Sequence, residues 1–145
     1  KSENLEDQNI FQLLGLTFFD PNEKESFLND LQERIWDDFI ESDTRLLLTE
    51  AERAHLMRLL TPDPRGLEAQ EDAVIYLENL VPDLGEIMTE KALILKGELA
   101  RARMEDLLLL YNDNSAMRAK LDAIGVFMDE ERWGSASAAL EEALK

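Results

Sequence analysis

The sequence predicts an all-α protein, and three observations support this prediction. Apolar residues recur at three- and four-residue steps through most of the chain, which is the spacing of one helix face. No segment shows sustained alternation of apolar and polar residues between turn dipeptides, as a half-buried strand would. All four prolines fall outside the interiors of the expected helices. We therefore expect an irregular bundle of about six to seven helices and no sheet.

Composition limits the class of protein and of partner. A chain of 145 residues, 45% apolar and 32% charged, has the size and composition of one folded domain. Its 32 acidic and 15 basic residues give a net charge of -17, which repels phosphate backbones and anionic lipid headgroups. We expect a protein partner or self-association, and no nucleic acid. The chain has no cysteine, which excludes disulfides, thiolate zinc sites and cysteine nucleophiles.

Nothing in the sequence indicates insertion into a membrane. No apolar run approaches the roughly 20 residues that span a bilayer. The first residues, Lys1 to Gln8, are polar and acidic rather than signal-like. We expect no membrane insertion and a cytoplasmic protein.

The first helices are predicted from their end signals. We expect a flexible tail over residues 1–8 and a short helix over 10–14, stopped by Gly15 in a left-handed C-cap. Asp20 followed by Pro21 predicts the start of a second helix. Polar residues 41–44 mark its end or a bend. Its expected apolar face consists of Leu28, Leu31, Ile35 and Phe39, with Phe27, Trp36 and Ile40 on the flanks.

A capping box predicts the next helix start. Thr49 and Glu52 have the required spacing, and the helix is expected to run to about Leu60. Two prolines and a glycine within residues 61–66 predict a loop. A further helix over about 67–81 is expected to end before Pro82.

The segment from Leu84 to about Tyr111 predicts a long central helix with two apolar stripes. We expect it to be buried on both sides. Gly97 costs about 1 kcal/mol relative to alanine in a helix interior, which a closely packed neighbouring helix would explain. The first stripe is Leu84, Met88, Ala92, Leu95, Leu99, Ala102 and Leu109; the second is Leu93, Gly97, Ala100, Met104 and Leu107 or Leu108.

The last third of the chain predicts a helical hairpin. A turn and cap signal at residues 112–115 precedes one apolar stripe ending at Met128, and a second helix rich in small residues begins at Trp133. We expect a flexible tail (1–8), a helical bundle (9–111) and a hairpin (112–145) packed on the bundle in one compact domain.

Glu52 and His55 are the candidate metal ligands. Their spacing places a carboxylate and an imidazole on one helix face, as in di-iron bundles. Such a site needs two of these motifs and two more carboxylates, and His55 is the only histidine, so only a symmetric oligomer would complete it. Glu52 is also explained by its capping box, so we favour structural roles for both residues.

The sequence contains no catalytic motif that we recognise. A histidine-based triad would again have to use His55, and there is no nucleophile elbow, Walker loop or dinucleotide-binding glycine pattern. We therefore expect no catalytic residues and no cofactor.

Two tryptophans are candidate anchors for a partner. Trp36 lies on a helix flank and Trp133 near a helix start, where tryptophan can bind a partner. Ile40, Leu140 and Leu144 are the apolar candidates that accompany them. Packing inside the chain is the favoured alternative.

Two resemblances add expectations about the fold. Leu14-Gly15-Leu16, the segment 35–39, Leu48 to Glu52 and the segment 81–87 resemble an uncharacterised bacterial family of small acidic helical domains, over about Leu14 to Leu110. That resemblance implies a helical fold and no chemistry. The C-terminal hairpin resembles one tetratricopeptide-type unit in its second helix, although Lys120 and Ile124 depart from the pattern and no second copy exists.

The leading hypothesis is a non-enzymatic interaction or assembly module. It rests on the doubly striped helix and on the missing catalytic motifs. Two alternatives stay open: a metal-handling oligomer that uses Glu52 and His55, and a structural subunit of a larger complex.

Overall fold

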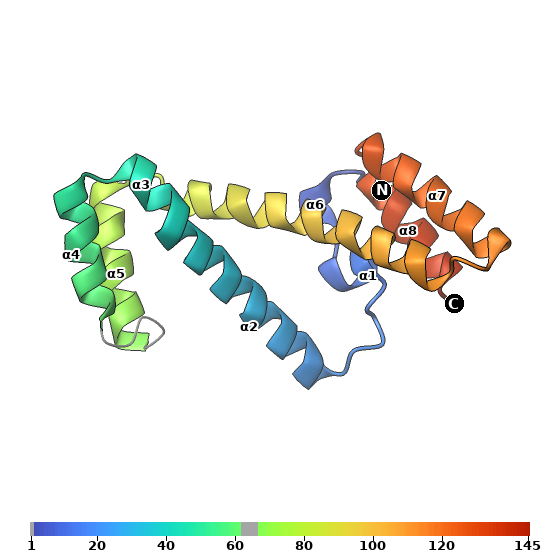
Figure 1. Ribbon diagram of the computed structural model, residues 1–145, viewed down its shortest axis with the longest axis horizontal. Coiled ribbons are helices and arrows are strands. Elements are labelled where there is room, and N and C mark those ends of the chain that lie inside the picture. The colour runs from blue at the N-terminus through green and yellow to red at the C-terminus, as the bar shows by residue number, and fades with distance from the viewer. Residues whose placement is uncertain (1, 62–66) are drawn as a thin grey trace. The chain divides into compact units, whose positions relative to one another are not determined.

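The computed structural model describes residues 2–61 and 67–145, and in these ranges every regular element is helical. A long helix, Leu84–Leu110 (α6), and a C-terminal pair, Ser115–Asp129 (α7) and Trp133–Ala143 (α8), confirm the predicted fold class (Figure 1). The loop predicted at residues 62–66 lies outside the described residues. Within the described ranges, no helix is both long enough and apolar enough to cross a membrane.

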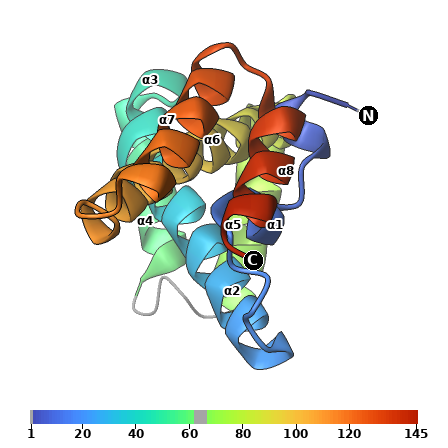
Figure 2. The same ribbon diagram turned by 90° about the vertical axis from the view of Figure 1, so that its right-hand side faces the viewer.

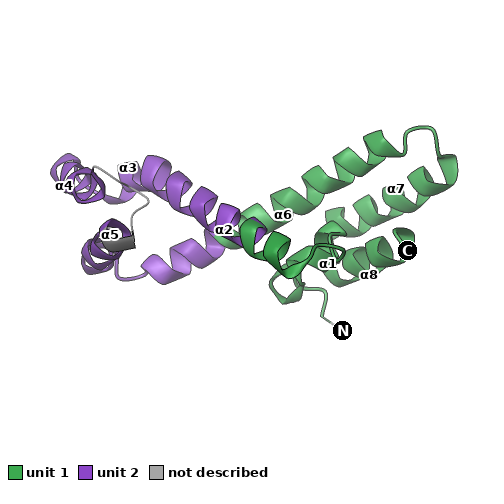
Figure 3. Ribbon diagram, turned by 90° about the horizontal axis from the view of Figure 1, so that it is seen from below, with its two compact units in different colours: residues 1–26, 92–145 green, residues 27–91 purple. Residues whose placement is uncertain are grey.

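The chain divides into two compact units, coloured separately in Figure 3. Unit 1 comprises residues 1–26 and 92–145, and unit 2 comprises residues 27–91. Helix α6 supplies its first residues to unit 2 and the others to unit 1, and the helix Pro21–Asp38 (α2) begins in unit 1. The boundaries of these units differ from those of the expected segments 1–8, 9–111 and 112–145, which stay a prediction. The difference arises because the N-terminal residues pack with the C-terminal helices.

Unit 2 is built around the helices Glu50–Leu60 (α4) and Leu67–Leu80 (α5), which lie side by side (Figure 1). The predicted capping box of α4 is confirmed. The Thr49 hydroxyl accepts from the Glu52 N–H at 3.1 Å, and the Glu52 carboxylate accepts from the Thr49 N–H at 2.9 Å. The buried core of unit 2 consists of Phe39, Ile40, Leu48, Leu56, Leu60, Ala73, Leu77, Val81 and Leu84.

The polar stretch after α2 does not end the helical path. A π-helical segment, Phe39–Asp43 (η2), continues directly into a short helix, Thr44–Leu47 (α3). Thr44 is fully buried there, and its hydroxyl donates to the Ile40 carbonyl at 2.6 Å and accepts from Arg53 Nε at 3.2 Å. The buried hydroxyl is therefore satisfied on both sides, which removes the cost of burying it.

The wide buried face expected on α2 is not formed. Leu28 is 42% exposed, Leu31 and Ile35 are half-buried, and α2 contains no buried residue. The core of unit 2 takes up this region of the chain only from Trp36 and Phe39 onward. The helix has the apolar spacing of a buried face, but this core covers only its end.

Unit 1 brings both ends of the chain together. The short helix Ile10–Leu14 (α1) packs against α8, and α7 packs on α8 as well (Figure 2). The predicted C-cap at Gly15 is confirmed, with φ at 68°. The buried apolar residues of unit 1 are Phe11, Leu13, Leu14, Leu95, Ala100, Met104, Leu107, Leu121, Ile124, Met128, Trp133, Ala136, Leu140 and Ala143.

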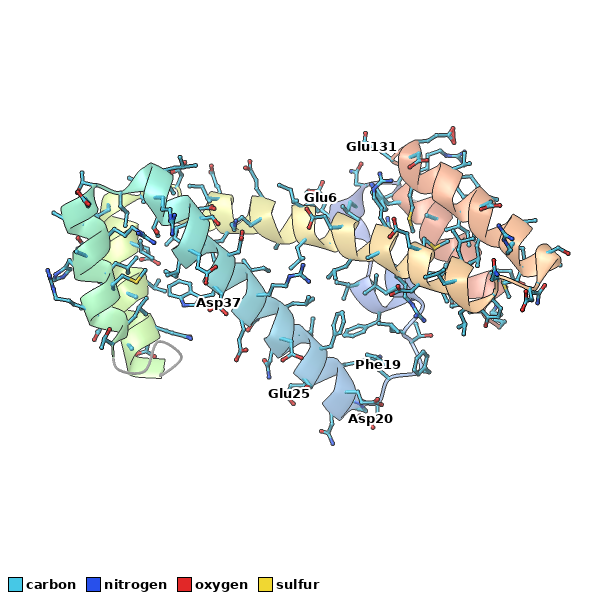
Figure 4. The ribbon with its side chains drawn as sticks, in the orientation of Figure 1. Glu6, Phe19, Asp20, Glu25, Asp37 and Glu131 are labelled. Atoms are coloured by element: carbon cyan, nitrogen blue, oxygen red, sulfur yellow. The ribbon has the colours of Figure 1, made fainter. Side chains whose placement is uncertain are left out.

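Two further features of unit 1 are the cap at the start of α2 and the turn between α7 and α8. Asp20, labelled at the start of α2 in Figure 4, accepts from the Glu23 N–H at 2.8 Å, which confirms the predicted start. Glu131, labelled in the same figure, has φ at 58° in the turn between α7 and α8. A non-glycine residue in this left-handed conformation costs about 1 kcal/mol. The Arg132 N–H, bonded to the Phe127 carbonyl at 2.8 Å, closes this turn.

The prediction that α6 is buried on both faces is only partly correct. On the second stripe, Gly97, Ala100, Met104 and Leu107 are buried. On the first stripe, Leu84 and Leu95 are buried, but Ala102 is exposed and Leu109 is 76% exposed. The remaining elements of unit 1 cover only one face of the C-terminal half of α6.

Residues 2–8, expected to be a flexible tail, form specific contacts instead. They include a 3-10 helix, Leu5–Asp7 (η1), and they contact α6 and α8. A Cβ at Gly97 would lie 3.3 Å from Leu5 Cδ2 and 3.9 Å from the Trp133 ring. The close approach expected at Gly97 therefore exists, but it involves η1 as well as a helix.

Candidate functional site

The two candidate metal ligands have local roles in unit 2. The Glu52 carboxylate completes the capping box of α4. The His55 ring packs against the Tyr76 ring at 4.6 Å between centroids, and Arg58 Nη2 lies 3.5 Å from His55 Nδ1. In the described part of the chain, no three His, Cys, Asp or Glu side chains are grouped so that they could hold a metal ion. Among these described residues the pair therefore gains no additional ligand.

The candidate partner-binding residues lie mostly inside the two units. Ile40 is 8% exposed in the core of unit 2, and Trp36 packs against that core. In unit 1, Trp133 is 7% exposed and Leu140 is fully buried. Leu144 is half-buried beside Gly15. In this structure their apolar surfaces serve mainly internal packing.

The structure instead places exposed apolar side chains around a pocket in unit 1. This pocket has a volume of about 470 Å³ and is lined by residues of α1, α6, α8 and the segment after α1. Phe18 and Leu110 line it and are 72% and 71% exposed. Leu107 and Leu144 also line it and are buried and half-buried, respectively. The pocket therefore combines buried apolar lining with exposed apolar residues.

Charged groups of both signs also line the pocket, since Glu141 is acidic and Arg103 and Lys145 are basic. Arg103 Nε donates to the Leu14 carbonyl at 2.9 Å, which fixes the guanidinium at the pocket wall. Lys145 lines the pocket and pairs with Glu142 at 3.4 Å. The half-buried Tyr111 adds a phenol to the lining. The Phe18 ring contacts the ring of Phe19, labelled in Figure 4, edge to face, with 5.1 Å between the ring centroids.

Of the residues that line this pocket, only Leu144 was a candidate predicted from the sequence, although one further signal was present. Residues 107–110 are four consecutive leucines. Successive helical residues are about 100° apart, so four in a row cannot all face one core. Leu107 is 2% exposed, whereas Leu109 and Leu110 are 76% and 71% exposed. No comparable signal marks Phe18, which lies outside the helices.

In unit 2, Lys91 has a raised pKa and belongs to a cluster with two aspartates. Lys91 Nζ contacts Asp38 and lies 3.0 Å from Asp43 Oδ1. The hydrogen bond with Asp38 is the main cause that raises the pKa of Lys91 above its ordinary value, and Asp43 contributes in the same direction. Both partners keep the lysine charged, so the cluster is an ion pair network and not a source of a neutral nucleophile.

The fold and the pocket define an all-α protein with a surface pocket in one of its two units. Comparisons with protein families, with curated proteins and with solved structures found no match to this chain. The resemblances to an uncharacterised bacterial family and to a tetratricopeptide-type unit therefore stay predictions.

Proposed function

We propose that this chain is a non-enzymatic protein interaction module, and that the pocket of unit 1 binds an apolar side chain of its partner. The observation that carries the proposal is the pairing of a pocket of about 470 Å³ with Phe18 and Leu110, each more than 70% exposed. Large apolar side chains that stay exposed next to a concavity are typical of surfaces that a partner covers.

The charge of the chain favours a partner segment that is basic outside its apolar anchor. With a net charge of -17, the chain attracts cationic proteins over about a Debye length. The pocket itself is lined by charged residues of both signs. The net negative charge of the chain therefore favours basic partners during approach, and the apolar contacts stabilise the complex. A small ligand buries most of its surface inside its pocket. Phe18 and Leu110 line this pocket but keep most of their apolar surface exposed, which a larger partner would cover.

The test is photo-crosslinking of the intact chain in lysate of its native host. In the reference chain, a photoreactive phenylalanine analogue replaces Leu109. The binding-deficient variant carries the same analogue together with Leu110→Glu. We expect one protein to crosslink, and the Leu110→Glu variant to lose at least 90% of that product, because the partner would have to bury a carboxylate at residue 110 against its apolar side chain.

Leu46 supplies the matched control, because it is 90% exposed and belongs to unit 2. Leu46→Glu should leave the crosslinked product unchanged. Equal loss in both variants, or an unchanged product in Leu110→Glu, contradicts the proposal. A crosslink between two copies of this chain would indicate self-association and not a separate partner. Sedimentation at several protein concentrations would then test the self-association.

A further inference from the structure

The N-terminal segment 2–8, here termed the strap, is held on unit 1 by a set of specific polar contacts. The Glu3 carboxylate accepts from the Ser135 N–H at 2.6 Å and from the Ser135 hydroxyl at 2.8 Å. Arg132 Nε lies 3.3 Å from the same carboxylate, and the Trp133 N–H donates to the Glu3 carbonyl at 3.1 Å. Glu3 therefore caps the start of α8, where Arg132 makes no side-chain cap of its own.

Two glycines shape the surface beneath the strap. A Cβ at Gly134 would lie 2.2 Å from the Ser2 carbonyl oxygen and 2.6 Å from the Glu3 carboxylate. A Cβ at Gly97 would lie 3.3 Å from Leu5 Cδ2. Any side chain at residue 134 would thus displace the strap. Absence of a side chain at both positions lets the strap lie directly on α6 and α8.

The charges of the strap and of its surface are complementary. Glu3, Glu6 and Asp7 belong to the strap, whereas Lys96 and Arg132 contact it from below. Lys96 Nζ donates to the Gln8 carbonyl. Burial lowers the pKa of Lys96, and the nearby Asp7 and Glu6 oppose that effect. The net charge of -17 repels an acidic segment at long range. At physiological salt this repulsion is screened beyond about 8 Å, so the basic residues at the site determine the interaction of a bound segment.

The strap is nevertheless weakly anchored by apolar contact. Its 3-10 helix contains no buried residue, and Glu6 and Asp7 are exposed. The polar contacts of Glu3 with Ser135 and of Gln8 with Lys96 are part-buried. Segments with few buried apolar contacts open at a lower cost in free energy than a core does. The strap can therefore leave at a lower cost than a core helix, and its departure removes the cap of α8 and uncovers Gly97 beside Trp133.

We propose that the strap is a displaceable internal ligand, and that the surface of Lys96, Gly97, Arg132, Gly134 and Ser135 binds an acidic segment of another protein. The segment that fits carries a glutamate followed two residues later by a leucine, as Glu3 and Leu5 do, and passes into a single 3-10 turn at that leucine. The strap then acts as an autoinhibitor, because partner and strap cannot occupy the same surface. This site is distinct from the pocket lined by Phe18 and Leu110.

The experiment uses a fluorescent peptide with the sequence of residues 2–9 and the full chain carrying Glu3→Ala and Leu5→Ala. These changes weaken the strap and leave the surface intact. Since a tethered segment has a local concentration on the order of millimolar, we expect the peptide to bind the double variant at least tenfold more tightly than wild type. Fluorescence anisotropy measures both affinities.

Three controls keep the outcome decisive. A third substitution, Gly134→Ala, should abolish peptide binding, because its Cβ occupies the position of the strap backbone. A peptide that carries alanine in place of the glutamate corresponding to Glu3 should bind at least tenfold more weakly. The single variant Glu6→Ala should behave like wild type, since the capping contacts of Glu3 remain.

Two results would overturn the proposal. One is absence of peptide binding to a double variant whose helix content matches that of wild type by circular dichroism. The other is equal binding with and without Gly134→Ala. Hydrogen exchange gives an independent readout: the Ser135 amide, which donates to Glu3, should exchange faster in Glu3→Ala. Unchanged peptide affinity in Leu110→Glu would separate this site from the pocket, so either proposal can fail without the other.

Discussion

Unit 2 folds from the continuous segment 27–91, whereas unit 1 combines residues 1–26 with residues 92–145. Their helix ends show what this difference means. In unit 2, α4 is capped by Thr49 and Glu52, three residues apart. In unit 1, α8 is capped by Glu3, which is 132 residues from Ser135. The short-range cap is encoded by neighbouring residues, while the long-range cap exists only once the two ends of the chain have met.

The largest expected effect comes from core leucines, one in each unit. Leu77 and Leu140 are both fully buried, and Leu→Ala at either position should lower the free energy of unfolding by about 2–5 kcal/mol. Hydrogen exchange then tests the comparison. Leu77→Ala should expose amides within residues 27–91. Leu140→Ala should also expose residues 10–14, because α1 packs on α8. Unchanged exchange at residues 10–14 would contradict the long-range assembly of unit 1.

Gly15 should give the next largest effect. Alanine there must adopt a φ of 68°, and its Cβ would lie 2.5 Å from Leu144 Cδ1. Backbone and packing strain together should cost about 2–3 kcal/mol in urea unfolding. Gly125, in the interior of α7 with open space around it, is the matched control. Gly125→Ala should stabilise the protein by about 0.5–1 kcal/mol. A loss of stability in Gly125→Ala would mean that the effect at Gly15 is not specific to its backbone and packing.

The local cap of unit 2 should have a smaller effect. Thr49→Ala removes the hydroxyl that accepts from Glu52 and should cost about 1 kcal/mol. Amide exchange should accelerate at residues 50–53 and stay unchanged at α8. Glu52→Gln keeps a side-chain acceptor at the third position of the capping box and should retain most of the stability. Faster exchange across α8 in Thr49→Ala would show that the effect of this cap is not local.

The smallest expected effect is a pH dependence at Lys91. Because its folded pKa is raised, the stabilisation by Asp38 and Asp43 is complete below the unfolded pKa of about 10.4. It is then lost as the pH rises through the folded pKa. Asp38 is solvent-exposed, so the contribution is at most about 1 kcal/mol. The stability difference between wild type and Lys91→Met should shrink from pH 9 to pH 11.5. Lys120→Met, at an exposed residue, should show no such trend.

Much of the helical framework could be predicted from short-range signals. The caps at Gly15, Asp20 and Thr49, and the cap at Asn114, where the side chain accepts from the Met117 N–H at 3.0 Å, lie where the sequence predicts them. Each involves atoms within a few residues, so the sequence contains all of the relevant information. The candidate site was not predictable in this way, because Phe18, Arg103 and Leu144 meet only through the packing of α1, α6 and α8.

Apolar periodicity by itself did not establish burial. The stripes of α2 and α6 have the spacing of buried faces, yet Leu28 and Leu109 are 42% and 76% exposed. Periodicity tells which residues share a face, and burial also requires another element to cover that face.

The sequence by itself determined the all-helical class, most of the helix ends and the long α6, because these depend on backbone hydrogen bonds and side chains within one or two turns. The tertiary structure alone decided which faces are covered, that residues 2–8 cap α8, and that Leu109 and Leu110 stay exposed beside a pocket. These features depend on contacts between distant segments, whose pairing is selected by the packing of the whole unit.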